Sequence, residues 1–365
     1  MLVAEAQRQL VDARVADRQT TYHCPACHAP VRLHRGRQVP PYFAHLPQAA
    51  CGVSSEGETP EHLLGKRQLA AFFHPWGPAT LERVLPTIQQ RADVWIGHQA
   101  QPVAVEFQCS PLALEAVAQR TAGYRQLGVY PLWLLGHRYR RQRLNWRLIE
   151  RFASWLPQWG LCLLFWDVRR ACLVVRHHLR QDAVGHYWGG QRRIGNWAQF
   201  LLGTTPPVSQ PALDGHRLRL QWTRNLQRQA PQLRLIQEQL YLTGHHLAGF
   251  PSVLATTQST APVFGQGLLL WRIVMGAWLF RGRPELTVAE VRTLSHRAYE
   301  LVGGHARGVR FQATGVLRSA QEQLLVDLVT GGYLVSSVQG WRVRQTPRWF
   351  RDYADWLKNH EKIKF

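Results

Sequence analysis

The chain has 365 residues, of which 44 are Lys or Arg and 23 are Asp or Glu, so its formal net charge is +21. Because 45% of the residues are hydrophobic and 15 are Trp, the composition supports a substantial core and excludes an intrinsically disordered protein. The positive charge favours a polyanionic partner, either a nucleic acid or an anionic membrane surface.

The first 55 residues are rich in Cys, His and Pro and contain a candidate metal site. A CxxC pair is followed by a His and a Cys in the pattern C-x2-C-x17-H-x5-C, at Cys24, Cys27, His45 and Cys51. Three thiolates and one imidazole at such spacing are typical of structural Zn²⁺. The alternative imidazole ligands are His23, His28 and His34. Reduced cysteines packed without a metal are the alternative to zinc.

Residues 56–150 predict an α/β domain. Thr59 and Pro60 are a helix start, and that helix continues to about Phe73. Apolar periodicity then predicts strands at 79–85, 91–96 and 102–108, a helix at 111–127 and a buried strand at 129–135. The polar turn at 97–101 joins the second and third of these strands, so we expect them to pair as a hairpin.

Two carboxylates belong to this hairpin. Glu106 and Gln108 lie two residues apart on one strand and share a face, and the hairpin brings Asp93 towards them. Such a set predicts a Mg²⁺ (or Mn²⁺) site that activates water against a phosphodiester. The alternative is a pair of strand-end charges that face solvent. Against it, Glu106 lies among apolar residues, where a carboxylate without a partner is costly to bury.

Two arginine runs with aromatic residues between them are candidate DNA-binding segments, since arginines beside rings contact phosphates and stack on bases. The first run consists of Arg138, Arg140, Arg141, Arg143 and Arg147, with Tyr139 and Trp146 between them. The second consists of Arg217, Arg219, Arg224, Arg228 and Arg234, with Trp222 in its middle. Solvated helix faces are the alternative for both.

Residues 151–365 predict a mainly helical, basic C-terminal domain, with a joint at Pro206, Pro207 and Pro211. The apolar stretch 268–280 is shorter than the roughly 20 residues of a membrane span and contains Arg272, so we expect its Trp271 helix in the core. We expect no membrane insertion and a cytoplasmic protein. A helix at 320–329 followed by a hairpin at 331–343 also fits a winged-helix module.

Six motifs between Tyr22 and Leu135 resemble the competence protein CoiA family and occur in the family's order. They are CPAC at 24–27, PYFAH at 41–45, EHLLGKRQL at 61–69, QRADVWI at 90–96, VEFQCS at 105–110 and RTAGY at 120–124. The resemblance covers roughly the first 140 residues, and residues 238–251 and the Trp271 helix resemble the family's C-terminal region more weakly.

The resemblance implies a zinc-finger-like N-terminal domain (1–55), a restriction-endonuclease-like α/β core of the PD-(D/E)XK superfamily (56–150) and a C-terminal domain (151–365). It implies catalytic roles for Asp93, Glu106, Gln108, Glu61 and Tyr124, and it makes Arg120 part of the same helix motif as Tyr124. We expect Arg120 to contact DNA together with the arginines of the first run, Arg138, Arg140, Arg141 and Arg143. Gln108 stands where the superfamily usually has Lys, so cutting is expected to be slow or absent.

Three residues of the middle domain have less certain roles. Glu61 is either a further metal ligand or a charge that complements the helix dipole. Glu82 ends the first strand and could face the site. Lys66 either replaces the cation missing at position 108 or, as the more usual arrangement, is a solvated surface lysine.

Together these observations predict a metal-dependent DNA nuclease that processes DNA for recombination during natural competence, with a recombinase and competence proteins as partners. The alternative is a non-catalytic accessory that presents single-stranded DNA to a recombinase. A defence-type endonuclease is a third possibility, because the same fold serves restriction. Hydrolysis requires Asp93 and Glu106, whereas binding requires mainly the arginines.

Overall fold

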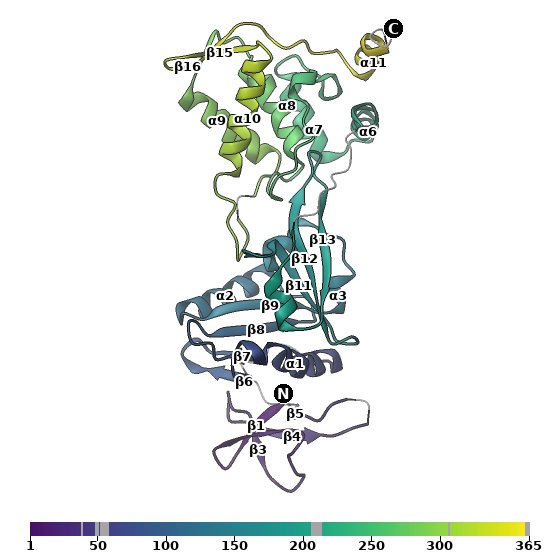
Figure 1. Ribbon diagram of the computed structural model, residues 1–365. Helices are drawn as coiled ribbons and strands as arrows, with labels where there is room; N and C mark the ends of the chain where they lie inside the picture. Colours follow the sequence, from purple (N-terminus) through teal and green to yellow (C-terminus); the bar gives the residue numbers. More distant parts are fainter. Residues whose placement is uncertain (38, 48–50, 52–57, 206–213, 306, 362–365) are drawn as a thin grey trace. The chain divides into compact units, whose positions relative to one another are not determined.

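The computed structural model describes the chain except for residues 38, 48–50, 52–57, 206–213, 306 and 362–365 (Figure 1). The chain forms two compact units. The first contains Met1–His178, Gly189–Pro206 and Gly308–Phe311; the second contains Leu179–Trp188, Pro207–Arg307 and Gln312–Phe365. The predicted joint at Pro206, Pro207 and Pro211 lies outside the described residues.

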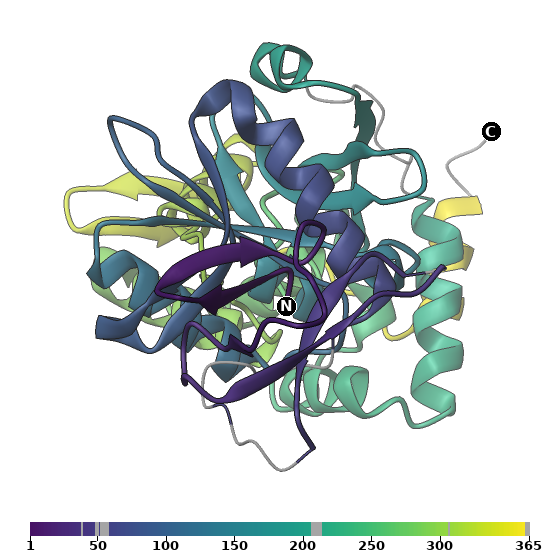
Figure 2. The same ribbon diagram turned by 90° about the horizontal axis from the view of Figure 1, so that it is seen from below.

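The first unit begins with a small antiparallel sheet, which is drawn in purple in Figure 2. Its strands follow the order β2-β1-β3-β4-β5. A small core, which includes Tyr22 and Phe43, holds the sheet together. The strands are β1 (Val3–Ala6), β2 (Gln9–Asp12), β3 (Tyr22–His23), β4 (Pro30–His34) and β5 (Tyr42–His45).

The second sheet of this unit is mixed and has the order β13-β12-β11-β9-β8-β7-β6. Strands β7 and β8 are antiparallel and β8 and β9 are parallel, which confirms the predicted hairpin. The Thr59 side chain caps the first helix by accepting from His62 N, as its N-cap position requires. The bounds are α1 (Pro60–Phe73), β6 (Ala79–Leu85), β7 (Gln90–Ile96), β8 (Val103–Gln108), α2 (Leu114–Gln126) and β9 (Tyr130–Leu135).

Helices cover both faces of this sheet. Leu69 and Phe73 of α1 pack with Val105 and Phe107 of β8 on one face. Tyr124 of α2 packs with Ala92 and Ala104 on the other face. Glu106 alternates with Val105 and Phe107, so its side chain points towards α2.

The expectation of mainly helical structure from residue 151 differs from the structure over residues 154–194, where further strands extend the central sheet. They are β10 (Ser154–Leu156), β11 (Gly160–Asp167), β12 (Cys172–Gln181) and β13 (Tyr187–Ile194). Every residue of β11 is buried. A continuous apolar run of this kind shows no period-2 alternation, so periodicity alone does not separate it from a buried helix. Two short helices, α3 (His137–Arg140) and α4 (Trp146–Phe152), lie between β9 and β10 in the sequence. A third, α5 (Trp197–Leu202), follows β13.

The second unit is largely helical around the predicted Trp271 helix. That helix, α8, is buried along nearly its whole length, as expected for core. The other elements are α6 (Gly215–Gln227), α7 (Pro231–Tyr241), α8 (Leu268–Leu279), β14 (Glu285–Thr287), α9 (Val288–Leu301), α10 (Val316–Thr330), β15 (Leu334–Ser337), β16 (Gly340–Val343) and α11 (Tyr353–Glu361). Among the described residues, no helix is both long and apolar enough to cross a membrane.

Candidate functional site

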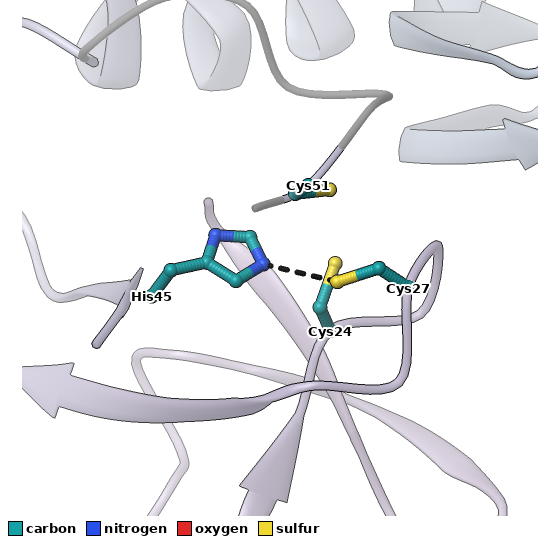
Figure 3. A group of neighbouring side chains, drawn as sticks. All are labelled: Cys24, Cys27, His45 and Cys51. Carbon is teal, nitrogen blue, oxygen red and sulfur yellow. Dashed lines mark hydrogen bonds between the residues drawn. The ribbon is translucent and has the colours of Figure 1, made fainter. Parts of the chain in front are cut away.

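The predicted zinc ligands converge in the N-terminal sheet (Figure 3). Cys24 and Cys27 follow β3, His45 ends β5, and Cys51 comes from the segment after it. One ligand atom from each of the four residues lies within 4.8 Å of the others. The Cys27 Sγ and His45 Nε2 atoms are 3.4 Å apart.

This donor set fits a closed tetrahedral zinc site. Zn–S bonds of about 2.3 Å place two sulfurs about 3.8 Å apart, so binding requires only a small contraction of the observed group. The alternative ligands do not join the cluster: His28 lies 3.6 Å from the Glu5 carboxylate and His34 stacks on Tyr42. The cluster is therefore consistent with a structural Zn²⁺.

The carboxylate pair lies at the hairpin of the central sheet. Val94 and Val105 are the last pair of the hairpin, and Asp93 and Glu106 are the next residues beyond that pair on their two strands. The Asp93 Oδ2 atom accepts from Phe107 N at 2.9 Å and contacts His62 Nε2 at 3.0 Å. Helix α1 thus meets the hairpin at Asp93, whose side chain is 13% exposed.

Both oxygens of Glu106 accept hydrogen bonds from α2. Arg120 Nη2 donates to Oε2 at 2.5 Å, and the Tyr124 hydroxyl donates to Oε1. These two residues lie one helical turn apart and therefore reach the same carboxylate. The Glu106 side chain is 1% exposed, and the Arg120 side chain, at 26%, lies between it and solvent.

The two carboxyls have opposite pKa shifts. Burial raises the pKa of Glu106 to about 7, with a further increase from Asp93, and the contacts of Arg120 and Tyr124 only partly offset these effects. Burial also acts to raise the pKa of Asp93, but His62, Lys66 and Arg120 outweigh it and lower that pKa below its usual range. Divergent pKa values in a close carboxyl pair are characteristic of functional sites.

The side chains of Gln108 and Glu61, two further predicted catalytic residues, form hydrogen bonds with nearby backbone groups. The Gln108 side-chain amide donates to Ser110 O at 2.9 Å. Glu61 Oε1 accepts from His137 N at 2.8 Å, at the start of α3. Glu61 therefore connects the start of α1 to the segment after β9.

The expectation of a solvated Lys66 is wrong. Its side chain is 0% exposed and donates to Glu58 Oε1 at 2.9 Å and to Glu82. Glu82 also accepts from Leu2 N and Val3 N, at 2.8 and 3.0 Å, so it connects the N-terminal sheet to the core instead of facing the carboxylate pair. Lysine is rarely buried without partners, and here the two partners lie outside α1, before its start and on β6.

The first arginine run begins on α3 and continues in the residues after it. Arg138, Arg141 and Arg143 are exposed, whereas Arg140 is half-buried and pairs with Asp167 at 2.5 Å. Tyr139 is 2% exposed, so the prediction that it stacks on bases is wrong. Its hydroxyl instead donates to Ser110 O at 2.8 Å.

Arginines missed by the sequence analysis extend this positive surface. Arg169 and Arg170 occupy the β11–β12 turn and are exposed, and Arg170 lies 3.6 Å from Asp167, which also binds Arg140. Arg176 of β12 donates to Arg140 O at 2.7 Å. These residues were overlooked because their strands were expected to be helical. We call the surface formed by Arg138, Arg140, Arg141, Arg169, Arg170 and Arg176 the basic surface.

The second arginine run is only partly exposed. Arg219 is 3% exposed and donates to Ala248 O at 2.6 Å and Phe250 O at 2.8 Å, and Trp222 is 6% exposed. Both residues lie on the buried side of α6. The exposed members are Arg217, Arg224, Arg228 and Arg234.

Sequence reasoning missed the contact between His62 and Asp93. His62 and Lys66 lie four residues apart on α1 and so share a face, which was the available signal. That signal does not say which residue the face meets, because this depends on how α1 packs across the sheet.

Two family models match the first half of the chain. The family model "Competence protein CoiA, N-terminal domain" matches residues 5–54, and "Competence protein CoiA, nuclease-like domain" matches residues 58–184. The competence protein CoiA of Bacillus subtilis (strain 168) is 35% identical over 117 residues, which are 32% of this chain and 31% of that relative. No solved structure matches the chain significantly. Residues 5–184 of the chain therefore carry the N-terminal and nuclease-like domains of the competence protein CoiA family.

Proposed function

We propose that the chain is a metal-dependent DNA nuclease that processes DNA taken up during natural competence. The observation that carries this proposal is the closeness of two largely buried carboxyls: Asp93 accepts from Phe107 N, next to Glu106, in a part of the chain that matches a nuclease-like domain. Two carboxylates together with water are a common way for proteins to hold Mg²⁺.

Asp93 and Glu106 would hold Mg²⁺ (or Mn²⁺), with Glu61 as a further ligand candidate. Bound there, the cation would place positive charge beside the scissile phosphate and lower the pKa of a water molecule. Gln108 can orient that water by hydrogen bonding but brings no charge. His62 and Phe107 N fix the orientation of the Asp93 carboxylate.

Arg120 and Tyr124 control the availability of Glu106. Each oxygen of Glu106 accepts one hydrogen bond from α2, yet a carboxylate oxygen has a second lone pair. A rotation of the partly exposed Arg120 side chain would open Oε2 and bring the guanidinium towards a phosphate. Arginine is suited to that contact because its planar fork binds phosphate bidentately.

The basic surface would bind the DNA backbone. It begins at α3, whose first backbone amide, His137 N, contacts Glu61. A strand bound along α3 and the β11–β12 turn would therefore approach the carboxylate pair. These contacts are to phosphates and predict little sequence preference.

A specific observation favours the second candidate, a DNA-binding accessory that presents single strands to a recombinase. Gln108 replaces the usual lysine and its amide holds Ser110 O, while the Glu106 oxygens are engaged by α2. Each of these features disfavours hydrolysis, and none of them involves the exposed Arg138, Arg141 and Arg169.

The test is cleavage of labelled single-stranded, duplex and branched DNA with Mg²⁺ or Mn²⁺, with binding measured in parallel. Glu106→Ala is expected to abolish cleavage and retain binding. Glu115→Ala is the matched control, since Glu115 is an exposed acid on α2. If the folded wild type cuts none of the substrates but binds DNA in a salt-sensitive way, the nuclease proposal fails and the accessory stands.

A further inference from the structure

Six elements of the second unit form a compact module with the order α8, β14, α9, α10, β15, β16. Its three strands are antiparallel and have the order β14-β16-β15. A helix, a strand, two helices and a hairpin that pairs back onto the first strand make up a winged helix. In DNA-binding members of the helix-turn-helix class, the helix in the position of α10 enters the major groove.

The composition of α10 is unsuited to that task. Its 15 residues include Arg318, Glu322 and Asp327, so they carry one positive and two negative charges. Arg318 pairs with Glu322 at 2.8 Å. DNA affinity depends on an excess of arginines and lysines that contact phosphates, and this helix has no such excess. Its exposed side instead includes Val326, at 56% exposure, and Val329, at 36%.

These valines line a groove between α9 and α10 with a volume of about 1080 Å³. On α9 the lining runs from Val288 to Tyr299, a length of about 16 Å at 1.5 Å per residue. Trp341 of β16 contributes from the small sheet. The lining of α9 spans three helical turns, which matches the length of a short amphipathic helix with anchors at i, i+4 and i+7.

The charges along the groove indicate the charge of a helix that could bind there. Arg292 and His296 line the α9 side and are exposed. Among the residues that line the groove, Glu322 is the only acid, and Arg318 pairs with it. The surplus charge around the apolar floor is therefore positive and complements carboxylates.

We propose that this groove binds an amphipathic, acidic helix of a partner protein, with aliphatic side chains against Val326 and Val329 and carboxylates towards Arg292. Single-stranded DNA fits the groove less well, because bases bind by stacking on exposed rings. Of the two rings that line the groove, Tyr299 is only 8% exposed and Trp341 is half-buried, whereas Val326 is 56% exposed.

The test uses the full chain and a labelled 16-residue helical peptide with three leucines on one face and glutamates beside them. One comparison peptide has lysines in place of the glutamates, a second has alanines in place of the leucines, and labelled oligo(dT) is the nucleic-acid probe. Val338→Asp is the control for Val326→Asp, because Val338, in the turn between β15 and β16, is fully exposed and does not line the groove. Arg292→Glu is matched by Arg281→Glu, an exposed arginine that also does not line the groove.

The leucine-glutamate peptide is expected to bind saturably and more tightly than either comparison peptide. Val326→Asp should weaken it about tenfold or more, as loss of an interface anchor does, while the two control variants retain wild-type affinity. Circular dichroism verifies that each variant is folded. Absence of saturable binding, equal losses in the control variants, or competition by oligo(dT) that depends on Val326 would overturn the proposal.

Discussion

The Cys24 cluster and the Asp93–Glu106 pair differ in what their ligand atoms contact. In the cluster, three sulfurs and one imidazole nitrogen converge within 4.8 Å of one another. In the carboxylate pair, both oxygens of Glu106 accept from α2, and Asp93 contacts His62. The cluster is therefore organised for a tightly held structural ion. In the carboxylate pair, a cation would have to share at least three oxygens with side chains of α1 and α2.

The largest expected effect comes from breaking the cluster. Cys24→Ser should abolish stoichiometric zinc and unfold the N-terminal sheet, because structural zinc contributes about 10 to 16 kcal/mol in small domains. Hydrogen exchange over residues 3–45 and zinc analysis of the purified protein measure both effects.

His28→Ala is the control for this change, since His28 is exposed and lies outside the cluster. It should keep the zinc. Full zinc content in Cys24→Ser, or zinc-free protein with a protected N-terminal sheet, would contradict the site and favour cysteines packed without metal.

A smaller effect is expected at Lys66, whose charge binds two acids at the junction of the N-terminal sheet and the core. Lys66→Met leaves Glu82 buried without this cation and should lower the free energy of unfolding of the first unit by about 3 to 5 kcal/mol. Urea denaturation of the full chain measures it. Lys358→Met is the control, since Lys358 is exposed, and it should leave the free energy of unfolding unchanged. If Lys66→Met is as stable as the wild type, the buried ion pairs of Lys66 do not stabilise the first unit.

The smallest effect is expected on the basic surface. Arg138→Gln and Arg141→Gln should each weaken binding of single-stranded DNA and reduce the slope of log affinity against log salt by about 0.7. Arg14→Gln is the control, because Arg14 is 65% exposed and pairs with Asp12 on the N-terminal sheet. If the slope is unchanged in the α3 variants, the DNA path lies elsewhere.

The elements that the sequence predicts best have local signals. Thr59 and Pro60 start α1 where expected, and the hairpin of β7 and β8 follows from a polar turn between two strands. This hairpin alone predicts that Asp93 approaches Glu106. Strand β11 was missed because its apolar run is compatible with both a strand and a buried helix.

The sequence alone does not predict which side chains from different elements contact one another. The burial of Lys66 depends on Glu58 and on Glu82, which has a left-handed φ of 55° within β6. The contact between His62 and Asp93 depends on the packing of α1 over β7. Neither spacing nor composition encodes these tertiary contacts.

The most direct test of the proposed metal site is a Mn²⁺ titration of the zinc-loaded protein, followed by electron paramagnetic resonance at about pH 6 and about pH 8. A cation must displace the proton of Glu106 below its raised pKa of about 7. Affinity should therefore rise about tenfold between these values, as the ionised fraction rises from roughly a tenth to roughly nine tenths. Glu106→Gln should lose this binding and Glu115→Gln should keep it. Binding that is independent of pH, or unchanged in Glu106→Gln, would contradict a cation held by this carboxylate pair.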